Sequence, residues 1–283
     1  MDDIDRYIDR VQHLPPAPTV AIQLLNLFSD PDRDIDRIVE LISHDPALTA
    51  ATLKRCNRAD LAGAEPTTDM FQAVCSLGLY EVYCVVTALI ASRTMAQVRA
   101  KYSADATRLW QHTVTTAVIA SLLARRVEVI DAAAFTAGLL HDVGKLIFIS
   151  VEGTHYAGLA GEAGNFGPAL AAAEESSIGF THADLGARLL SRWGLPENIC
   201  LAVKHHHRLP AAAAPHQRLA ATVNFGNLLA HQIIEVPKNI PAAADASPEA
   251  MELVALTAKD IPALMQQIEQ ALAGVQPLLQ MQG

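Results

Sequence analysis

Apolar residues recur at helical spacing over most of the chain and are separated by short polar or proline-containing breaks. Near the N-terminus, Val20, Leu24 and Phe28 follow the period of one helical face. Further on, Asp45 precedes Pro46, and an aspartate N-cap with proline in the first turn is typical of a helix start. Strand-like alternation is hard to find. The pattern therefore predicts an all-α protein.

Breaks in the pattern divide the predicted helices into groups. Candidate loops cover part of residues 152–168 and all of residues 208–215 and 237–248. We expect a two-lobed helical bundle. Its parts are an N-terminal helical lobe over residues 1–100, a second lobe with most of the histidines over residues 101–235, and C-terminal helices over residues 236–283.

Polar residues recur on the apolar faces of the second lobe. Four predicted helices each place one polar side chain on the face that their aliphatic residues occupy. These inward-facing residues are His112, His182, His206 and Asn227. A fifth apolar helix ends in the pair His141-Asp142. Helical faces show that the side chains point inward, but not that they meet.

A single buried histidine is more often a hydrogen-bonded core residue than a metal ligand, and His141-Asp142 could simply cap a helix. Burying a polar group without a partner costs about 1–3 kcal/mol, so five independent cases in one lobe would be costly. If the side chains converge, they can satisfy one another through a metal, because imidazole and carboxylate are ligands of Zn, Fe and Mn. Without a metal, we expect hydrogen bonds and water to bridge them.

Composition narrows the possible functions. The chain has 283 residues, 51% of them hydrophobic, and a formal net charge of −9. Binding to phosphates needs clustered positive charge, so this chain without a Lys/Arg run is not expected to bind DNA directly. No uncharged apolar run reaches the roughly 18 residues of a membrane span, and the acidic start MDDIDRYIDR is unlike a signal peptide. Four scattered cysteines without a CxxC pair suit a reducing cytoplasm, where we expect the protein to reside.

The order of the polar residues resembles that of a known superfamily. GLLHDVGK is similar to the central motif of the HD metal-dependent phosphohydrolases, whose pattern is His … His-Asp … Asp. The segments LPPAPTVAIQLL, ISHDPALTAATLKRCNRA, FQAVCSLGLYEVYCVVTAL, LWQHTVTTAVIASLLA and HADLGARLLSRWGLPENICLAVKHHH resemble signature segments of the HDOD family, the HD-related output domains. This resemblance covers roughly residues 10–235. It implies an HD-domain-like second lobe and a response-regulator output role in bacterial signal transduction, in a family whose members have mostly lost HD-type catalysis.

The resemblance also implies a site. Its metal ligands would be His112, His141, Asp142, His182, His206, His207 and Asn227, holding one or two ions of Fe or Zn, or none if the site is a relic. Asn227 stands where an active HD enzyme has its last Asp, and an amide brings no negative charge and cannot act as a base. The Gly-Tyr-Pro signature of the cyclic-di-GMP phosphodiesterases is missing.

Three basic residues receive simpler interpretations. Lys145, in the central motif, is a candidate phosphate or ligand contact, but a lysine near a helix end more often solvates that end, which is the interpretation we favour. Arg188 and Arg192 lie four residues apart on an outer helical face. They are interpreted as a solvated face rather than as an anion or partner site.

Two functions of different classes fit these features. The one we favour is a non-catalytic signalling output domain acting through protein–protein contacts, supported by Asn227, the missing Gly-Tyr-Pro and the acidic balance. The alternative is a metal-dependent phosphohydrolase or phosphodiesterase acting on a nucleotide, which the retained His/Asp set supports. Taken together, these features favour a domain without catalytic turnover. Expected partners are signalling proteins such as an upstream receiver or sensor module, without DNA or membrane. The sequence does not determine the oligomeric state.

Overall fold

The structure, a computed structural model, describes residues 3–11, 19–30, 34–58, 66–99, 105–163, 167–209, 216–235 and 247–279. Within these ranges every regular element is a helix, so the predicted all-α fold is confirmed. The candidate loops at residues 208–215 and 237–248 lie almost entirely outside the described residues. The third candidate loop contains a helix, α10 (Thr154–Ala163), whose Tyr156 and Ala160 are buried.

The chain forms two compact units, one of which comprises residues 17–94. Its helices are α2 (Thr19–Ser29), α3 (Ile35–Ser43), α4 (Pro46–Cys56), α5 (Met70–Leu77) and most of α6 (Leu79–Arg99). The predicted helix start at Asp45 is confirmed, because its carboxylate accepts hydrogen bonds from the backbone N–H groups of Ala47 (2.8 Å) and Leu48 (3.2 Å). Arg93 holds the same carboxylate in an ion pair of 2.7 Å.

The other unit comprises residues 1–16 and 95–282 and carries the candidate site. Its helices are α1 (Asp3–Ile8), α7 (Asp105–Ala124), α8 (Asp131–Leu140), α9 (Val143–Glu152), α10, α11 (Pro168–Ile178), α12 (His182–Arg192), α13 (Glu197–Lys204), α14 (Gln217–Glu235), α15 (Pro248–Leu253), the 3₁₀ helix Ala258–Asp260 and α16 (Ile261–Leu279). Helix α1 thus groups with the histidine-bearing helices. The division into lobes at residues 100 and 235 stays a prediction.

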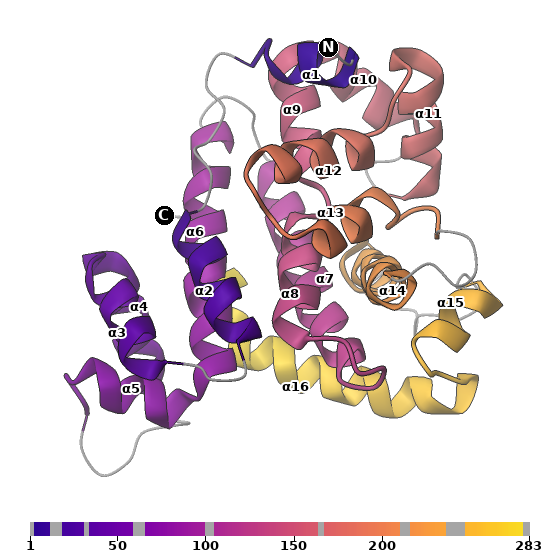
Figure 1. Cartoon of the computed structure of the whole chain (residues 1–283). Helices are drawn as coiled ribbons and strands as arrows, with labels where there is room; N and C mark the ends of the chain where they lie inside the picture. The colour runs from indigo at the N-terminus through magenta and orange to yellow at the C-terminus, as the bar shows by residue number, and fades with distance from the viewer. Residues whose placement is uncertain are drawn as a thin grey trace. The chain divides into compact units, whose positions relative to one another are not determined.

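Small residues bring three central helices of this unit close together. Helix α7 packs against both α8 and α14, and Figure 1 shows the three side by side. A Cβ atom on Gly138 of α8 would lie 2.7 Å from Ala117 Cα in α7, and one on Gly226 of α14 would lie 3.1 Å from the Thr116 backbone oxygen. This close approach lets polar side chains from different helices reach one another.

The apolar segment that contains His141-Asp142 consists of two helices with a break between them. Helix α8 ends with His141 as its C-cap, and α9 begins at Val143. Helix α9 packs so closely on α12 that a Cβ atom on Gly144 would lie 1.9 Å from the backbone oxygen of His182. Since His182 is the first residue of α12, this contact places it beside the break.

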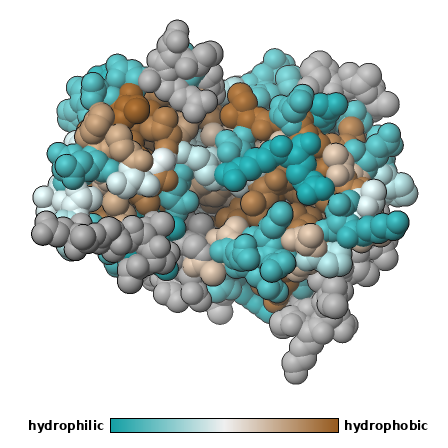
Figure 2. Space-filling model, turned by 90° about the horizontal axis from the view of Figure 1, so that it is seen from below, coloured by the Kyte–Doolittle hydropathy of each residue, from teal (hydrophilic) through white to brown (hydrophobic). Residues whose placement is uncertain are grey.

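A buried apolar core joins α7 and α14 to the C-terminal helices, with Ile119, Phe225 and Leu264 among its members. On the face drawn in Figure 2, hydrophilic residues lie among hydrophobic ones. In the part of the chain that the structure describes, the large hydrophobic side chains that are exposed are Phe71 and Ile130. Most of the apolar surface is therefore used for internal packing.

One described segment, Asp131–Glu152, is apolar and long enough to cross a membrane by length and composition. The pair α5 and α6, bent by 109°, passes the same test only when taken as one span. In Asp131–Glu152, 89% of the apolar window is buried inside the protein. Such burial is typical of the core helix of a soluble domain.

Candidate metal centre

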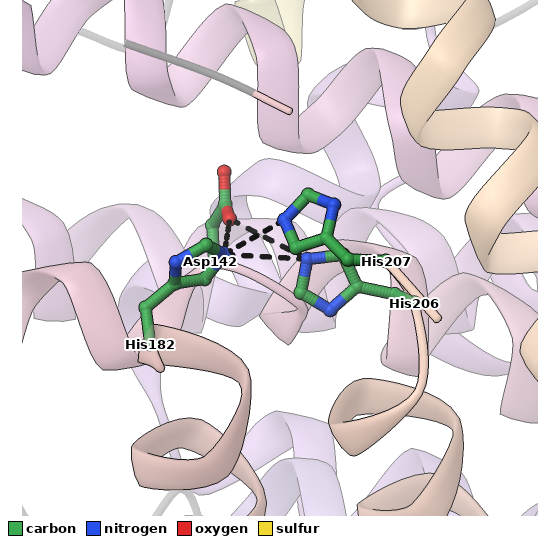
Figure 3. A group of neighbouring side chains, drawn as sticks. All are labelled: Asp142, His182, His206 and His207. Atoms are coloured by element: carbon green, nitrogen blue, oxygen red, sulfur yellow. Dashed lines mark hydrogen bonds and ion pairs between the residues drawn. The ribbon is translucent and has the colours of Figure 1, made fainter. Parts of the chain in front are cut away.

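Helix ends and helix faces bring the predicted site residues together. His112 comes from α7, His141 and Asp142 from the α8–α9 break, His182 from the start of α12, His206 and His207 from the turn after α13, and Asn227 from α14. All of them are buried except His207, which is partly exposed. Figure 3 shows four of these side chains directed toward one another.

The ligand-capable atoms fall into two groups that share Asp142. The His182 half consists of Asp142, His182, His206 and His207, and the His112 half consists of His112, His141 and Asp142. Within each half, one nitrogen or oxygen atom of every residue lies within 4.8 Å of the others. The structure thus brings the predicted residues together, while their role as metal ligands stays a prediction.

Three of the histidines are held in one tautomer. Nδ1 of His141 lies 2.7 Å from the Gly138 carbonyl oxygen, and Nδ1 of His206 lies 2.6 Å from the Val203 carbonyl oxygen. Nδ1 of His182 lies 2.6 Å from a carboxylate oxygen, as described below. Because these oxygens accept, each Nδ1 carries the proton and donates it. In the neutral rings the lone pair is therefore on Nε2, which faces the cluster.

The carboxylate beside His182 belongs to Glu174 of α11, which the sequence analysis missed. Its Oε2 accepts from His182 Nδ1 (2.6 Å) and from the His182 backbone N–H (2.8 Å), and its Oε1 accepts from the Tyr156 hydroxyl (2.6 Å). Glu174 is fully buried. A carboxylate that orients the ring of a metal-binding histidine is a common partner in metal sites. The available signal was Leu170, one helical turn earlier on the same face.

The spacing within the His182 half fits one ion. Nε2 of His182 lies 3.0 Å from Nε2 of His207, 3.4 Å from Nε2 of His206 and 3.3 Å from Oδ1 of Asp142. Nε2 of His206 lies 3.9 Å from the same Oδ1. Four ligand atoms bound at about 2.0–2.1 Å around a tetrahedral Zn²⁺ ion lie about 3.3 Å apart. The buried Oδ1 of Asp142 makes no hydrogen bond with the described residues.

The His112 half is engaged differently. Nε2 of His112 and Oδ1 of Asn227 are 2.8 Å apart, and since the amide oxygen accepts, His112 donates. Oδ2 of Asp142 accepts a hydrogen bond of 2.8 Å from Lys145 Nζ. His141 Nε2 lies 3.3 Å from the same oxygen. Two of the three ligand atoms in this half are therefore bonded within the protein.

Lys145 does not solvate a helix end, so the favoured interpretation of this residue is wrong. It lies in the first turn of α9 and is only 4% exposed. The ammonium group is buried because the carboxylate of Asp142, three residues earlier, neutralises it. A phosphate contact by Lys145 stays a prediction.

Burial keeps three of the imidazoles neutral, because it lowers the pKa values of His112, His206 and His207. It lowers the pKa of His206 well below the ordinary value of 6.5, and the neighbouring His207 and His141 add to this effect. Burial is also the main reason why the pKa values of His112 and His207 lie well below 6.5. Neutral imidazoles coordinate a metal without first releasing a proton.

For Asp142 and His182, the effect of neighbouring charged groups on the pKa outweighs the effect of burial. Burial by itself would raise the pKa of Asp142, but His141 and Lys145 hold it well below its ordinary value of 3.8. Burial would lower the pKa of His182, but the neighbouring carboxylates of Glu174 and Asp142 raise it above 6.5. Asp142 is therefore an anion at neutral pH and supplies the negative charge that a cation needs.

A cavity of about 510 Å³ borders the cluster. Its lining includes His207 and Asn227 from the site, together with Arg208, Asn224 and His231. The Asn224 amide donates a hydrogen bond of 2.8 Å to the His206 carbonyl oxygen, which ties the wall of the cavity to the histidine turn. The cavity gives the partly exposed His207 edge of the cluster access to small molecules.

The residues present fit a divalent transition-metal ion. Three imidazole nitrogens and one carboxylate oxygen form a donor set used by Zn and Fe. They converge without a rearrangement of the backbone, and Asp142 Oδ1 is a buried anionic atom that lacks a hydrogen-bond donor among the described residues. Such an ion would polarise a bound water or a phosphoryl oxygen.

Comparison with known proteins identifies the family of the chain. The family model of the HDOD domain matches residues 14–209. An uncharacterized protein of Treponema pallidum (strain Nichols) is 29% identical over 224 residues, which cover 78% of this chain and 42% of that protein. The chain thus spans less than half the length of this relative.

Two solved structures share the fold. An HDOD domain protein of unknown function from Geobacter sulfurreducens has a TM-score of 0.79 at 24% identity, covering 97% of this chain and 96% of that chain. A protein assigned to signal transduction in Marinobacter aquaeolei VT8 has a TM-score of 0.76 at 21% identity, covering 98% of this chain and 64% of that chain. Because the family match spans most of the sequence, the chain belongs to the HDOD family.

Proposed function

We propose that this chain is a non-catalytic output domain of bacterial signal transduction, which acts through protein–protein contacts and holds a metal ion as a structural centre. The observation that carries the proposal is the hydrogen bond between His112 Nε2 and Asn227 Oδ1. At this position an active HD site needs an acidic ligand. Here the Asn227 amide oxygen accepts a hydrogen bond from His112 Nε2, so both atoms are engaged with each other rather than with a metal ion.

This pairing weakens catalysis in two ways. Asn227 adds no negative charge to the centre, so a bound ion keeps more of its positive charge unbalanced and is held less tightly. Asn227 also cannot take a proton from water, and the anionic group near the ion is Asp142, already paired with Lys145. The cluster therefore retains histidines and an aspartate that can bind a metal ion, but it lacks the acidic side chain that catalysis would need at residue 227.

A metal centre at this place would stabilise the output domain. Its ligands come from the α8–α9 break, α12 and the turn after α13, which are distant in sequence. Binding to the folded state alone adds directly to the free energy of unfolding. Helices held in fixed positions by a bound ion would present a defined surface to a partner protein.

Composition supports a protein partner rather than a nucleic acid. A net charge of −9 opposes association with phosphates, and we expect no DNA complex at physiological salt. The partners proposed are signalling proteins, such as an upstream receiver or sensor module. Three of the four cysteines, Cys56, Cys84 and Cys200, are buried, which suits the reducing cytoplasm that we propose as the compartment.

A second candidate, hydrolysis of a nucleotide, is favoured by one observation. The His182 half keeps a ligand set with an adjoining cavity of about 510 Å³, large enough for a small molecule. A metal-bound water in that half could reach a phosphate held in the cavity. The retained set is the reason to test turnover directly.

The deciding experiment is an assay of the full chain, stripped with a chelator and reloaded with Zn²⁺ or Fe²⁺, against nucleotides and cyclic dinucleotides. The proposal predicts bound metal without turnover. Asp142→Asn, which removes the shared anionic ligand, is the control for any activity that is seen. Hydrolysis by the loaded wild type that disappears in Asp142→Asn would replace the proposal with the phosphohydrolase.

A further inference from the structure

We propose that the centre takes up a single divalent transition-metal ion, in the His182 half, and that Lys145 and Asn227 close the His112 half to a second ion. This inference rests on the metal binding in the proposed function and specifies where it occurs. It assigns Lys145 a role as an internal cation in place of a metal.

The His182 half is open to an ion. Nε2 of His182 and Nε2 of His206 carry lone pairs toward the cluster, because both rings donate through Nδ1. Oδ1 of Asp142 faces them, at 3.3 Å from His182 Nε2 and 3.9 Å from His206 Nε2 (Figure 3). His207 lies 3.0 Å from His182 at the cavity side. Without an ion, a proton on His207 Nε2 can be donated to the lone pair of His182 Nε2, and an ion in this half would take the place of that proton.

The His112 half is closed by two hydrogen bonds. His112 uses Nε2 to donate to Asn227, so this nitrogen has no lone pair for a metal. Oδ2 of Asp142 is held by Lys145 at 2.8 Å. Nε2 of His141 makes no hydrogen bond with the described residues, so it is the ligand atom that stays available in this half. A single imidazole is too few ligands for a stable site.

Lys145 also opposes a second ion by charge. In two-metal sites the ions lie about 3.5–4 Å apart and share ligands. The second ion here would share Asp142 with the first, on the oxygen that the ammonium group occupies. Lys145 is 4% exposed, so its ammonium group is held away from water beside Asp142. Two like charges in a buried site repel strongly.

Metal stoichiometry tests the inference. The full chain is stripped with a chelator, saturated with Zn²⁺, desalted and measured by elemental analysis, and binding is followed by calorimetry. The expected result is one Zn²⁺ per chain. Two ions in the wild type would overturn the inference while leaving metal binding intact. None in a folded wild type would overturn the metal centre itself, whereas the turnover assay separately decides the output role.

Paired variants locate the ion. His207→Gln is expected to weaken Zn²⁺ binding about tenfold or more, as loss of a ligand or its support does in known sites. His112→Gln is expected to leave the affinity unchanged, with exposed His155→Gln as the surface control. Circular dichroism confirms folding of each variant. The reverse order, with binding lost in His112→Gln and kept in His207→Gln, would place the ion in the other half.

A gain of occupancy tests the closing residues. Lys145→Met combined with Asn227→Asp removes the internal cation and restores an acidic ligand beside His112. The expected stoichiometry rises from one to two Zn²⁺ per chain. A folded double variant that still binds one ion would show that these residues do not close the site. If the double variant does not fold, the His112 and His207 variants decide the location alone.

Discussion

Glu174 Oε2 lies 2.6 Å from His182 Nδ1, and both side chains are fully buried. This contact joins α11 to the first residue of α12 and sets which nitrogen of His182 faces the cluster. The carboxylate is itself held by the Tyr156 hydroxyl at 2.6 Å. The result is a Tyr–Glu–His chain that ends at the candidate centre and positions one of its ligands.

Replacing Glu174 with Gln should weaken metal binding. The amide removes the negative charge that favours the Nδ1–H tautomer of His182, and loss of such a partner typically costs about 10- to 100-fold in affinity. Competition of Zn²⁺ between the protein and a chromophoric chelator measures the change. Exposed Glu175→Gln is the matched control and should bind as the wild type does. Equal affinity in folded Glu174→Gln would show that the contact serves packing alone.

The glycine in the HDVGK motif should be intolerant of substitution. A Cβ atom on Gly144 would lie 1.9 Å from the His182 backbone oxygen, so α9 and α12 would have to separate. Overpacking of this kind costs about 1–3 kcal/mol, and it should also displace His182 and weaken Zn²⁺ binding. Urea unfolding measures the stability.

Gly158→Ala is the control for helix propensity. Gly158 is exposed in α10, and a Cβ atom there would meet nothing within 4 Å. Alanine should therefore raise the free energy of unfolding, by about 0.4–1 kcal/mol. A Gly144→Ala variant that is as stable as Gly158→Ala would contradict the close contact between α9 and α12.

Helical periodicity was enough to predict which side chains point inward. The pattern placed His112, His182, His206 and Asn227 on apolar helical faces. The structure buries all four, although His206 lies in the turn after α13 rather than within a helix. Periodicity does not measure the distance between helices, because that depends on contacts such as the one at Gly144, which leave no repeating signal. The sequence could therefore predict the members of the cluster but not its division into two halves.

Glu174, which the sequence analysis missed, and Lys145, which it misinterpreted, are buried for a similar physical reason. Glu174 stands beside Glu175 in an alanine-rich segment and resembles part of a solvated acidic pair. Lys145 follows an apolar helix and resembles a solvating residue at its end. Glu174 can be buried because it accepts hydrogen bonds from Tyr156 and His182. Lys145 can be buried because the carboxylate of Asp142 neutralises it. The partners of Glu174 lie 18 and 8 residues away, so a local pattern does not show them. Asp142 lies only three residues before Lys145, and the contact depends on the break between α8 and α9, which the interpretation of Lys145 as a helix-end residue did not include.

Arg188 and Arg192 are exposed, as the interpretation of a solvated face expects, and both also pair with acidic residues in or just after α1. Arg188 makes a two-pronged ion pair with Asp5 at 2.6 and 2.7 Å, and Arg192 pairs with Asp9 at 2.8 Å. Three of these four side chains are at least 38% exposed, so screening by solvent should keep the contribution of the pairs to stability small. The anchor of α1 is instead a buried aromatic side chain, as the next prediction tests.

Tyr7→Ala should release α1. Tyr7 is buried, packs edge-on against Phe148 and Phe180, and donates a hydrogen bond of 2.8 Å to Glu152. Loss of a buried aromatic side chain costs about 3–5 kcal/mol, whereas Arg192→Ala should cost about 1 kcal/mol or less. Hydrogen exchange of residues 3–8 reports the release. Stronger release by Arg192→Ala than by Tyr7→Ala would mean that the ion pairs anchor the helix.

Asp45 provides a prediction about pH in the other unit. The hydrogen bond from Arg93 is the main reason why the pKa of Asp45 falls from 3.8 to about 2. A carboxyl group with a lowered pKa in the folded state stabilises the protein above its unfolded pKa, and this contribution is lost as the pH falls through the folded pKa. The stabilising effect of the Asp45 charge should therefore be complete above about pH 4 and disappear toward about pH 2.

Two substitutions separate the charge of Asp45 from its capping role. Asp45→Asn keeps an oxygen that can accept from the Ala47 and Leu48 N–H groups, so it should lose only the ion pair. Because Asp45 is 33% and Arg93 44% exposed, screening limits that loss to about 1 kcal/mol or less. Asp45→Ala also loses the cap and should cost about 1–2 kcal/mol in total.

Urea unfolding from pH 6 to pH 3 should show the wild type and Asp45→Asn converging as the pH falls, while Asp45→Ala stays less stable than Asp45→Asn throughout. A gap between wild type and Asp45→Asn that does not narrow below pH 4 would rule out the carboxylate charge as its source.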